Sequence, residues 1–333
     1  MSEYGEKSGE FEWIGRIRKE FAALVPPGME GIGDDCAVIP AGDGESLVIT
    51  TDMLIEDVHF VADKISPGDL GYKSLAVNLS DVAAMGATPI ASFLSAGLPG
   101  QLSEDWRNAF LEGFKTLSEE FNVPLLGGDT TASGKLVINV TAIGKTSDAN
   151  IKRRSAARPG DLICVAGNLG DSAAGLRLLF NKADYTEQEK ALIHLHHHPR
   201  PLVKEGSWLG AQKEVHALMD ISDGIASDLM HILKESAVSA TVELTCLPVS
   251  DGLIKVCAEN GWDPMELSVS GGEDYTLLLT VDPAEIATLN RAYSERFGRE
   301  LEIIGRIGEG RPRVEWLYED KPIEIDWKGF SHF

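Results

Sequence analysis

The hydrophobic pattern of the N-terminal half alternates between the periods of strands and helices. Residues 46–54, SLVITTDML, form a short run rich in β-branched residues, which predicts a strand. Residues 71–87, GYKSLAVNLSDVAAMGA, have apolar positions at helical spacing and predict a helix. Residues 103–121 predict an amphipathic helix with Ser103 as its N-cap, and residues 135–145 alternate as a strand does. This order of elements predicts an α/β fold.

A polar, basic segment separates this half from the rest of the chain. Residues 146–161, TSDANIKRRSAARPGD, have no sustained apolar period. After them the pattern starts again with LICVAG and NLGDSAAGLRLLF, which predict a strand, a glycine-rich turn and a helix. A length of 333 residues also favours two domains. We therefore expect one α/β domain over residues 1–148 and a second over residues 149–333.

The charge balance excludes two classes of partner. The sequence has 52 acidic against 30 basic residues, which gives a formal net charge of −22 at pH 7. Nucleic acids and anionic membrane surfaces are bound by clustered Lys and Arg, so we expect neither as a partner. With 43% hydrophobic residues, the chain has enough apolar material for a packed core and is expected to be a soluble globular protein. A protein this acidic needs cations to handle anionic ligands.

The N-terminus and the cysteines indicate a cytoplasmic protein. The first residues, MSEYGEKSGEFEWIGRI, have neither the basic nor the apolar region of a signal peptide, and no long apolar run predicts a membrane span. The four cysteines have no CxxC spacing and lie in or beside apolar stretches, which favours buried free thiols: Cys36, Cys164, Cys246 and Cys257. Free thiols fit a reducing compartment.

Acidic turns recur along the chain, most of them beside glycine. The stretch GIGDDCAVIP, residues 31–40, places Asp34 and Asp35 before an apolar run, and similar turns are ITTD, NLSD, GGDTT, MDISDG and SGGEDY. A single Asp of this kind has an ordinary explanation, because Asp often caps turns and helices. Six together favour a site in which carboxylates and hydroxyls hold Mg²⁺, which prefers oxygen ligands and bridges carboxylates to phosphates. We expect at least one of the two adjacent aspartates to hold metal.

The usual nucleotide-binding motifs are absent from the sequence. It has no GxxxxGK[ST], no HRD and DFG pair, and no GxGxxG after a first strand. The turn GNLGDSAAG, residues 167–175, could hold an anion at a helix N-terminus, or it could be a purely structural tight turn. The pattern alone leaves both interpretations open.

Eight blocks of the sequence resemble, in order, those of the thiamine-monophosphate kinase family. They are GIGDDCAVI, TTDMLIEDVHF, KSLAVNLSDVAAMGATP, LLGGDTT, GDSAAGL, MDISDGIASDL, SGGEDYTLLLT and IDWKGFSHF. This family belongs to the superfamily of aminoimidazole ribonucleotide synthetase. The resemblance implies a two-domain α/β fold whose N-terminal sheet pairs with that of a second subunit in a homodimer. It also implies ATP-dependent phosphorylation of thiamine monophosphate to thiamine diphosphate.

The resemblance also implies roles for individual residues. Several Mg²⁺ ions would be held by oxygen ligands from Asp35, Thr50, Thr51, Asp52, Asp81, Asp129, Asp220 and Asp223. ATP would contact Gly128, Asp129, Arg154 and Ser222. Thiamine monophosphate would contact His59, Glu273 and Trp327. An indole ring suits a cationic heteroaromatic ring, and a carboxylate can accept a hydrogen bond from an amino group.

No residue is expected to act as a covalent catalyst. The acceptor implied by the resemblance is a phosphate oxygen, which is already anionic at neutral pH and needs no general base. The difficulty is to bring two anions together, and Mg²⁺ would relieve it by neutralising and aligning both phosphates. We therefore expect direct in-line transfer and leave the catalytic residues unassigned.

Several of these positions also have structural explanations. His59 lies between two apolar residues and could be a half-buried histidine with satisfied hydrogen bonds. Trp327 could pack the C-terminal tail, and Arg154 has basic neighbours that could take its role. The cluster HLHHHP, residues 194–199, has no cysteine nearby and precedes a Pro-rich segment, so we assign it no metal.

Two other functions remain as alternatives. One is another ATP-dependent enzyme of the same superfamily. A selenophosphate synthetase would carry Cys or selenocysteine before Gly31, where this sequence has no Cys. A hydrogenase-maturation enzyme would carry a C-terminal Cys, where this sequence reads SHF. The other alternative is a non-catalytic regulator that binds Mg-nucleotide and keeps the carboxylates for binding alone. Only turnover separates such a regulator from a kinase.

Overall fold

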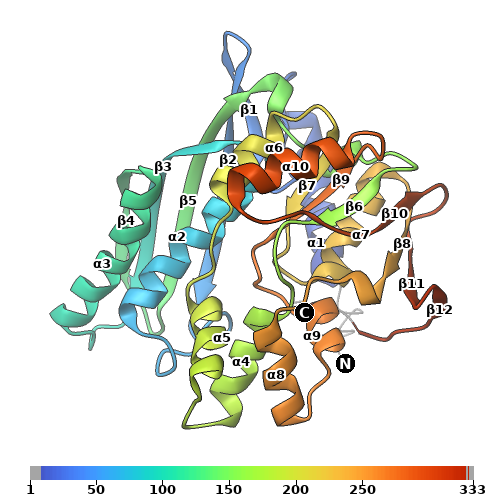
Figure 1. Ribbon diagram of the computed structural model, residues 1–333. Coiled ribbons are helices and arrows are strands. Elements are labelled where there is room, and N and C mark those ends of the chain that lie inside the picture. Colours follow the sequence, from blue (N-terminus) through green and yellow to red (C-terminus); the bar gives the residue numbers. More distant parts are fainter. Residues whose placement is uncertain (1–8, 328, 330–333) are drawn as a thin grey trace, which may run out of the picture.

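The N-terminal half of the chain forms a five-stranded sheet. The computed structural model describes residues 9–327 and residue 329 (Figure 1). The strand order of this sheet is β1-β2-β5-β3-β4, and neighbouring strands are antiparallel except β3 and β4. The strands are β1 (Ala37–Gly42), β2 (Glu45–Ile55), β3 (Thr88–Leu98), β4 (Leu125–Ala132) and β5 (Val137–Ser147). The strands predicted over residues 46–54 and 135–145 are confirmed as β2 and β5.

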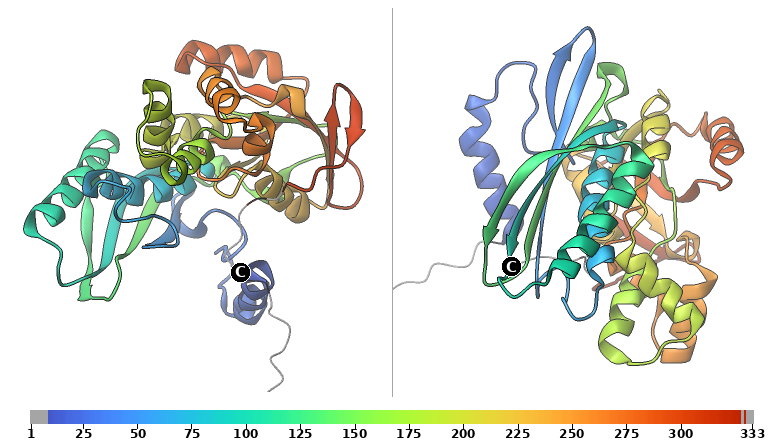
Figure 2. Two further views of the ribbon diagram at one scale, coloured as in Figure 1. Left: turned by 90° about the horizontal axis from the view of Figure 1, so that it is seen from below. Right: turned by 90° about the vertical axis from the view of Figure 1, so that its left-hand side faces the viewer.

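One face of this sheet is covered by two helices. Along β2 and β5, buried positions alternate with half-exposed ones, because successive side chains of a strand point to opposite faces. Helices α2 (Pro67–Ala84) and α3 (Glu104–Phe121) lie side by side on the buried face (Figure 2, right). The other face remains half-exposed along β2 and β5, and the edge strand β4 is exposed over its whole length.

Both helices begin at a serine that caps them. The hydroxyls of Ser66 and Ser103 each accept a 3.1 Å hydrogen bond from the backbone N–H three residues later. The predicted N-cap Ser103 is therefore confirmed. The helix predicted over residues 71–87 begins earlier, at Pro67, because proline fits the first helical position. It ends at Ala84, and Gly86 then takes a left-handed conformation with φ of 71°.

Two glycines allow α2 and α3 to approach closely. A Cβ added to Gly71 would lie 2.0 Å from the carbonyl oxygen of Phe110, and one added to Gly113 would lie 1.8 Å from that of Gly68. Any larger residue at either position would push the helices apart. The contact fixes the position of α2 and therefore of the side chains that it carries.

The C-terminal half forms a seven-stranded sheet. Its order is β12-β11-β8-β10-β6-β9-β7, and neighbouring strands are antiparallel except β8 and β11. The strands are β6 (Leu162–Val165), β7 (Val215–Asp220), β8 (Ser239–Glu243), β9 (Leu277–Val281), β10 (Glu302–Gly308), β11 (Val314–Tyr318) and β12 (Lys321–Ile323). The central strands are buried on both faces, and β9 has no exposed residue.

Helices surround this second sheet. Helices α4 (Asp171–Asn181), α5 (Glu187–His197) and α8 (Asp251–Asn260) pack on one another around an apolar cluster of their own, at the bottom of Figure 1. The remaining helices are α1 (Glu10–Phe21), α6 (Val203–Gly210), α7 (Ile225–Ser236), α9 (Pro264–Ser270) and α10 (Ile286–Phe297). A helix with the length and apolar character of a membrane span is not found among the described residues.

Helix α2 lies between the two sheets, and the hydrophobic core continues across it. It contacts β2 and β5 on one side and α6 and β7 on the other. One buried cluster joins Val48 and Val140 of the first sheet to Leu218 and Leu279 of the second. A second cluster lies on the opposite face of the second sheet and includes Met219, the neighbour of Leu218. The two halves of the chain are therefore packed on each other through an apolar interface.

The four cysteines differ in exposure. All are free thiols, and three of them are buried. The expected burial is wrong for Cys246, which is exposed. It lies in a 3₁₀ turn, Leu244–Cys246, that follows β8 at the surface, so its apolar neighbours in sequence do not enclose it.

Candidate metal and substrate site

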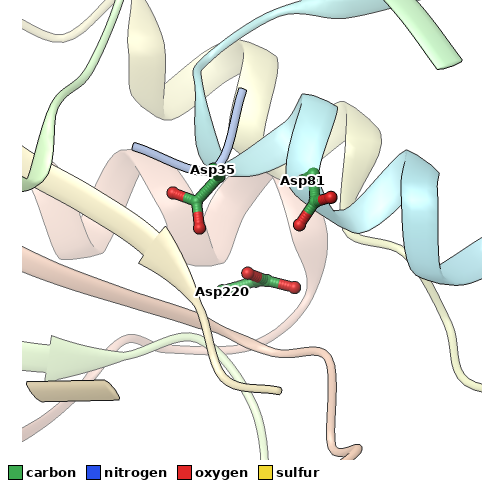
Figure 3. A group of neighbouring side chains, drawn as sticks. All are labelled: Asp35, Asp81 and Asp220. Carbon is green, nitrogen blue, oxygen red and sulfur yellow. The ribbon is translucent and has the colours of Figure 1, made fainter. Parts of the chain in front are cut away.

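Three carboxylates converge where the two halves of the chain meet (Figure 3). They come from the loop before β1, from α2 and from the last residue of β7, and they belong to Asp35, Asp81 and Asp220. One oxygen of each lies within 4.8 Å of the corresponding oxygens of the other two. The structure thus brings together three of the predicted metal ligands, and we call these three residues the carboxylate cluster.

Hydrogen bonds tie α2 to both sheets beside the carboxylate cluster. The hydroxyl of Ser80 donates a 2.6 Å hydrogen bond to Oδ2 of Asp220 on β7. The side-chain oxygen of Asn78 accepts a 3.1 Å hydrogen bond from the backbone N–H of Asp52 on β2. These bonds connect regular elements, so the positions of α2, β2 and β7, which carry Asp81, Asp52 and Asp220, are fixed relative to one another.

The electrostatics of the site call for cations. Burial, followed by repulsion from Asp35, raises the pKa of Asp52 to about 6 and that of Asp220 to about 8. Burial, followed by repulsion from Asp52, raises the pKa of Asp81 well above its ordinary value. One oxygen of Asp35, Oδ2, is buried and has no hydrogen-bond partner among the described residues. A buried, oxygen-only ligand set with an unpartnered carboxylate oxygen fits Mg²⁺.

The two adjacent aspartates of the GDD turn have different partners. Asp35, whose side chain is 1% exposed, accepts a 2.5 Å hydrogen bond from Nη2 of Arg154. Asp34 accepts a 2.7 Å hydrogen bond from the backbone N–H of Arg154. Arg153, by contrast, pairs with Glu30. Asp35 is therefore the member of the turn that enters the carboxylate cluster, and Arg154 is the linker arginine beside it.

A cavity of about 1040 Å³ opens beside the carboxylate cluster. Residues from both halves of the chain line it, including β2 and α2 from the first and α4 and the loops after β7 and α9 from the second. Its lining includes six of the predicted site residues: Asp52, His59, Asp81, Ser222, Asp223 and Glu273. Val58, Leu176 and Phe180 form an apolar part of the wall. Such a cavity can hold a ligand with both a charged and an apolar portion.

Four buried polar residues that line this cavity were not predicted from the sequence. They are Lys73, His196, His197 and Tyr275. Lys73 lies in α2 with 1% of its surface exposed. The available signal was a lysine in a predicted helix of mostly apolar and small residues, because lysine is almost never fully buried unless paired. The histidines lie in a cluster whose spacing indicates no particular ligand.

Comparison with known proteins decides the family. Residues 33–146 match the family of the AIR synthase related protein, N-terminal domain, and residues 158–317 match that of its C-terminal domain. The thiamine-monophosphate kinase of Salmonella typhimurium is 37% identical over 327 residues, which cover 98% of each chain. That of Haemophilus influenzae is 38% identical over 332 residues, again 98% of each chain. The chain belongs to the thiamine-monophosphate kinase family.

Solved structures of the thiamine-monophosphate kinase family have the same fold. The structure of AaThiL complexed with AMPPCP and TMP is 34% identical, with a TM-score of 0.85 over 99% of this chain and 100% of that chain. The thiamine-monophosphate kinase of Stenotrophomonas maltophilia K279a is 37% identical, with a TM-score of 0.76 over 94% and 98%. E. coli HypE, a hydrogenase maturation protein at 19% identity, shares the fold alone. The predicted two-domain α/β fold is confirmed, and the pairing of sheets between subunits stays a prediction.

The thiamine-monophosphate kinase pattern assigns three consecutive residues of β2 to metal, and the structure separates them. Thr50 donates a 2.5 Å hydrogen bond to Oδ2 of Asp81, and Asp52 lines the cavity. Thr51 points to the opposite face of the sheet, where its hydroxyl accepts a 3.1 Å hydrogen bond from that of Thr141. Within this chain only the first and third residues face the carboxylate cluster, and the role of Thr51 stays a prediction.

The GGDT segment of the family lies on the exposed edge strand β4. Gly128 must be glycine there, because its φ is 150° and an added Cβ would lie 1.7 Å from the carbonyl oxygen of Leu94. Asp129 accepts a 2.9 Å hydrogen bond from the N–H of Thr130. Two strands separate β4 from β2, which places them roughly 14 Å apart at the usual strand spacing. The structure does not bring Asp129 to the carboxylate cluster, and its assigned roles stay predictions.

The glycine-rich turn at residues 167–175 is closed by a carboxylate of the same chain. The backbone N–H groups of Gly170 and Ser172 donate hydrogen bonds of 2.7 and 3.2 Å to Asp274. These groups are the ones that a phosphate would use at the start of α4. Because Asp274 already occupies that position, the structure favours a purely structural turn.

The three residues assigned to thiamine monophosphate lie in two places. His59 and Glu273 line the cavity, and Nδ1 of His59 accepts a 2.9 Å hydrogen bond from the N–H of Ile55. Trp327 is partly buried against the second apolar cluster, on the face of the second sheet that points away from α2, while Gly329 lines the cavity. The tail therefore passes the cavity, and the contact of Trp327 with the acceptor stays a prediction.

The histidine cluster at residues 194–198 contributes to packing and to the cavity wall. His198 pairs with Asp69 and stacks on Tyr72, with ring centroids 4.2 Å apart. His196 and His197 are buried and line the cavity. Within the described part of the chain, only the carboxylate cluster brings three potential ligand atoms close enough together to share one metal ion.

Proposed function

We propose that the chain is a kinase that transfers the γ-phosphoryl group of ATP to the phosphate of thiamine monophosphate, giving thiamine diphosphate. The observation that carries this proposal is the single cavity that joins Asp52 and Asp81 to Glu273 and His59. A charged end for phosphates and a separate end for a heteroaromatic group match the two portions of this acceptor. The proposal is supported by AaThiL, which is named as a complex with AMPPCP and TMP and matches 99% of this chain.

The proposed metal is Mg²⁺, and we expect the site to bind more than one ion. Its ligands would be the carboxylate cluster with Thr50, Asp52 and Asp223, and the family pattern adds Thr51 and Asp129. Bound Mg²⁺ would offset the negative charge of the phosphate oxygens during transfer. The chain adds a positive charge of its own through Arg154, whose guanidinium lies beside Asp35. Gly128, Asp129, Arg154 and Ser222 are the proposed contacts of ATP.

The acceptor would be bound by His59, Glu273 and Trp327. Glu273 is the residue of this set whose carboxylate can accept a hydrogen bond from an amino group; it lines the cavity, and its side chain is 24% exposed. The phosphate of the acceptor needs no base, because it is anionic at neutral pH. Transfer is therefore direct and in line, and the residues of the chain contribute by positioning the substrates and excluding water.

The open face of the first sheet supports a homodimer. Alternate residues of β2 and β5 are half-exposed on this face, and the edge strand β4 exposes Leu125 by 42% and Leu126 by 62%. An exposed apolar edge strand is a site for pairing with another chain. Sedimentation equilibrium should give twice the chain mass of 36.0 kDa, and a monomer at micromolar concentration would contradict the proposal.

A cytoplasmic location is supported by the four free thiols.

The proposed reaction is tested by incubating the purified chain with γ-labelled ATP, Mg²⁺ and a panel of phosphorylated acceptors. The expected result is label in thiamine diphosphate, with thiamine monophosphate as the best acceptor. With no acceptor present, the protein should stay unlabelled, because transfer needs no phosphorylated residue.

Other outcomes of the same experiment point to the alternatives. Turnover with a different acceptor only would indicate another enzyme of the superfamily. Binding of Mg-ATP with no turnover on any acceptor would indicate a non-catalytic regulator. Label on a His or Asp that passes to the product when acceptor is added would overturn direct transfer.

A further inference from the structure

A buried lysine forms part of the cavity wall. The side chain of Lys73 is 1% exposed, and its Nζ lies 2.9 Å from Oε1 of Glu273, 200 positions later in the chain. No described atom completes a hydrogen bond to this Nζ. Taking an ammonium group out of water costs several kcal/mol unless a charged partner offsets it. The ion pair with Glu273 is therefore the interaction in the structure that accounts for a charge at this position.

Each oxygen of the Glu273 carboxylate lies near a side-chain nitrogen. Its Oε2 lies 3.4 Å from Nδ1 of His196, and that nitrogen lies 3.0 Å from the hydroxyl of Ser172. Burial lowers the pKa of His196 well below its ordinary value, so this ring is neutral at pH 7. Lys73 is thus the cation that contacts the carboxylate. It comes from the N-terminal half of the chain, whereas His196 and Ser172 come from the C-terminal half.

The backbone of Glu273 is also constrained. Its φ is 64°, a left-handed conformation that is uncommon for a residue with a side chain. Its N–H donates a 2.7 Å hydrogen bond to the carbonyl oxygen of Ser222, next to the proposed metal ligand Asp223. Such strained backbone occurs mainly at functional sites, where surrounding contacts hold it in place. The side chain is therefore set in one position relative to the loop that follows β7.

Helix α2 fixes the distance between this ion pair and the carboxylate cluster. Lys73 and Asp81 are eight residues apart in one helix, which corresponds to about 12 Å along its axis. Both residues line the same cavity. The close approach of α2 to α3 and its burial between two sheets prevent the helix from shifting. The end of the cavity near Glu273 therefore lies at a constant distance from the end that would hold phosphate.

We infer that Lys73 is a positioning residue for the acceptor: it holds the Glu273 carboxylate in a fixed orientation, so that this carboxylate binds an amino group of the acceptor's heteroaromatic ring. This inference rests on the proposed function and adds the residue that determines recognition of the ring end. Lys73 itself contacts neither phosphate nor metal in this arrangement. Its loss should therefore weaken binding of thiamine monophosphate and leave binding of Mg-ATP unchanged.

The inference is tested by a double-mutant cycle with Lys73→Met and Glu273→Gln, read by calorimetric binding of thiamine monophosphate and of Mg-ATP. Lys73→Met should weaken binding of thiamine monophosphate by about tenfold or more, because it leaves the carboxylate without its fixed partner. The dissociation constant of Mg-ATP should change by less than about twofold. In the Glu273→Gln background, Lys73→Met should have almost no further effect, because the carboxylate that it positions is gone. Lys115→Met, at an exposed lysine of α3, is the matched control.

The outcomes separate the two proposals. Failure of the wild-type chain to bind thiamine monophosphate would overturn the proposed function. Wild-type binding combined with equally tight binding by Lys73→Met, or equal losses for both ligands, would overturn the role of Lys73. If Lys73→Met does not fold, the double variant decides, because it contains no carboxylate that has lost its charged partner. A further tenfold loss relative to Glu273→Gln alone would then contradict the inference, and an unchanged affinity would support it.

Discussion

Asp81→Asn should lower kcat for thiamine diphosphate formation by about 10²- to 10³-fold, the usual effect of losing one charge-stabilising group. Asp81 belongs to the carboxylate cluster and is repelled by Asp52, Asp220 and Asp35. Removing its charge removes a metal ligand, and with it the charge that would offset the transferring phosphoryl group. The substitution also relieves repulsion, so the melting temperature measured without Mg²⁺ should stay equal or rise. Steady-state kinetics and thermal unfolding of the same sample check both effects.

Asp34→Asn is the matched control for this substitution. Asp34 lies outside the carboxylate cluster and accepts a hydrogen bond from the N–H of Arg154, which the amide oxygen of Asn could also accept. Its kcat should fall by less than about tenfold, the value of one neutral hydrogen bond. Equal losses in Asp81→Asn and Asp34→Asn would mean that the carboxylate cluster is not the metal site.

Arg154→Met should lower the free energy of unfolding by about 3–5 kcal/mol in Mg²⁺-free buffer, the cost of breaking a buried ion pair. The two side chains of the pair with Asp35 are 19% and 1% exposed, so water cannot replace the lost cation. Added Mg²⁺ should restore a large part of the loss, because a divalent cation at the carboxylate cluster supplies the missing positive charge. Chemical denaturation with and without Mg²⁺ measures both quantities.

Arg153→Met provides the comparison at the neighbouring residue. Arg153 pairs with Glu30 at the surface, where the two side chains are 33% and 39% exposed. Surface pairs of this kind contribute about 1 kcal/mol or less, so the loss should be small and independent of Mg²⁺. A Mg²⁺-independent loss in Arg154→Met as well would show that Arg154 has a packing role only.

Residue pattern alone was enough to predict that acidic turns meet at one site, although the GGDTT turn lies apart on β4. Asp35 lies just before β1, Asp81 lies in a helix that packs on β2, and Asp220 ends β7; such positions can meet when the sheets form. Alternation along β2 could also have predicted that Thr50 and Thr51 face opposite sides, because the side-chain period of a strand is two. Assigning neighbouring strand residues to one site in a single chain ignores that period.

Other features depend on contacts between distant segments, which no local pattern contains. The glycine-rich turn was ambiguous because the group that closes it, Asp274, lies 104 positions from Gly170. Lys73 matches an ordinary core position until Glu273 is placed beside it. Cys246 lies between the buried Leu244 and Leu247 and is nevertheless exposed, because the chain leaves the sheet at that turn. In each case the local sequence predicts the secondary-structure element, but the role of the residue depends on how distant segments pack around it.

The apolar core that continues across α2 has a consequence for how this protein unfolds. A linker of polar composition divides the sequence into two halves, yet α2 buries one side against β2 and β5 and the other against α6 and β7. Separating the halves would expose the apolar residues of α2 that face the second sheet and would leave Lys73 without its charged partner. Neither half can lose its structure without removing part of the other's core. The two halves therefore form one cooperative unit, in which local opening of the linker costs far less free energy than separation of the sheets.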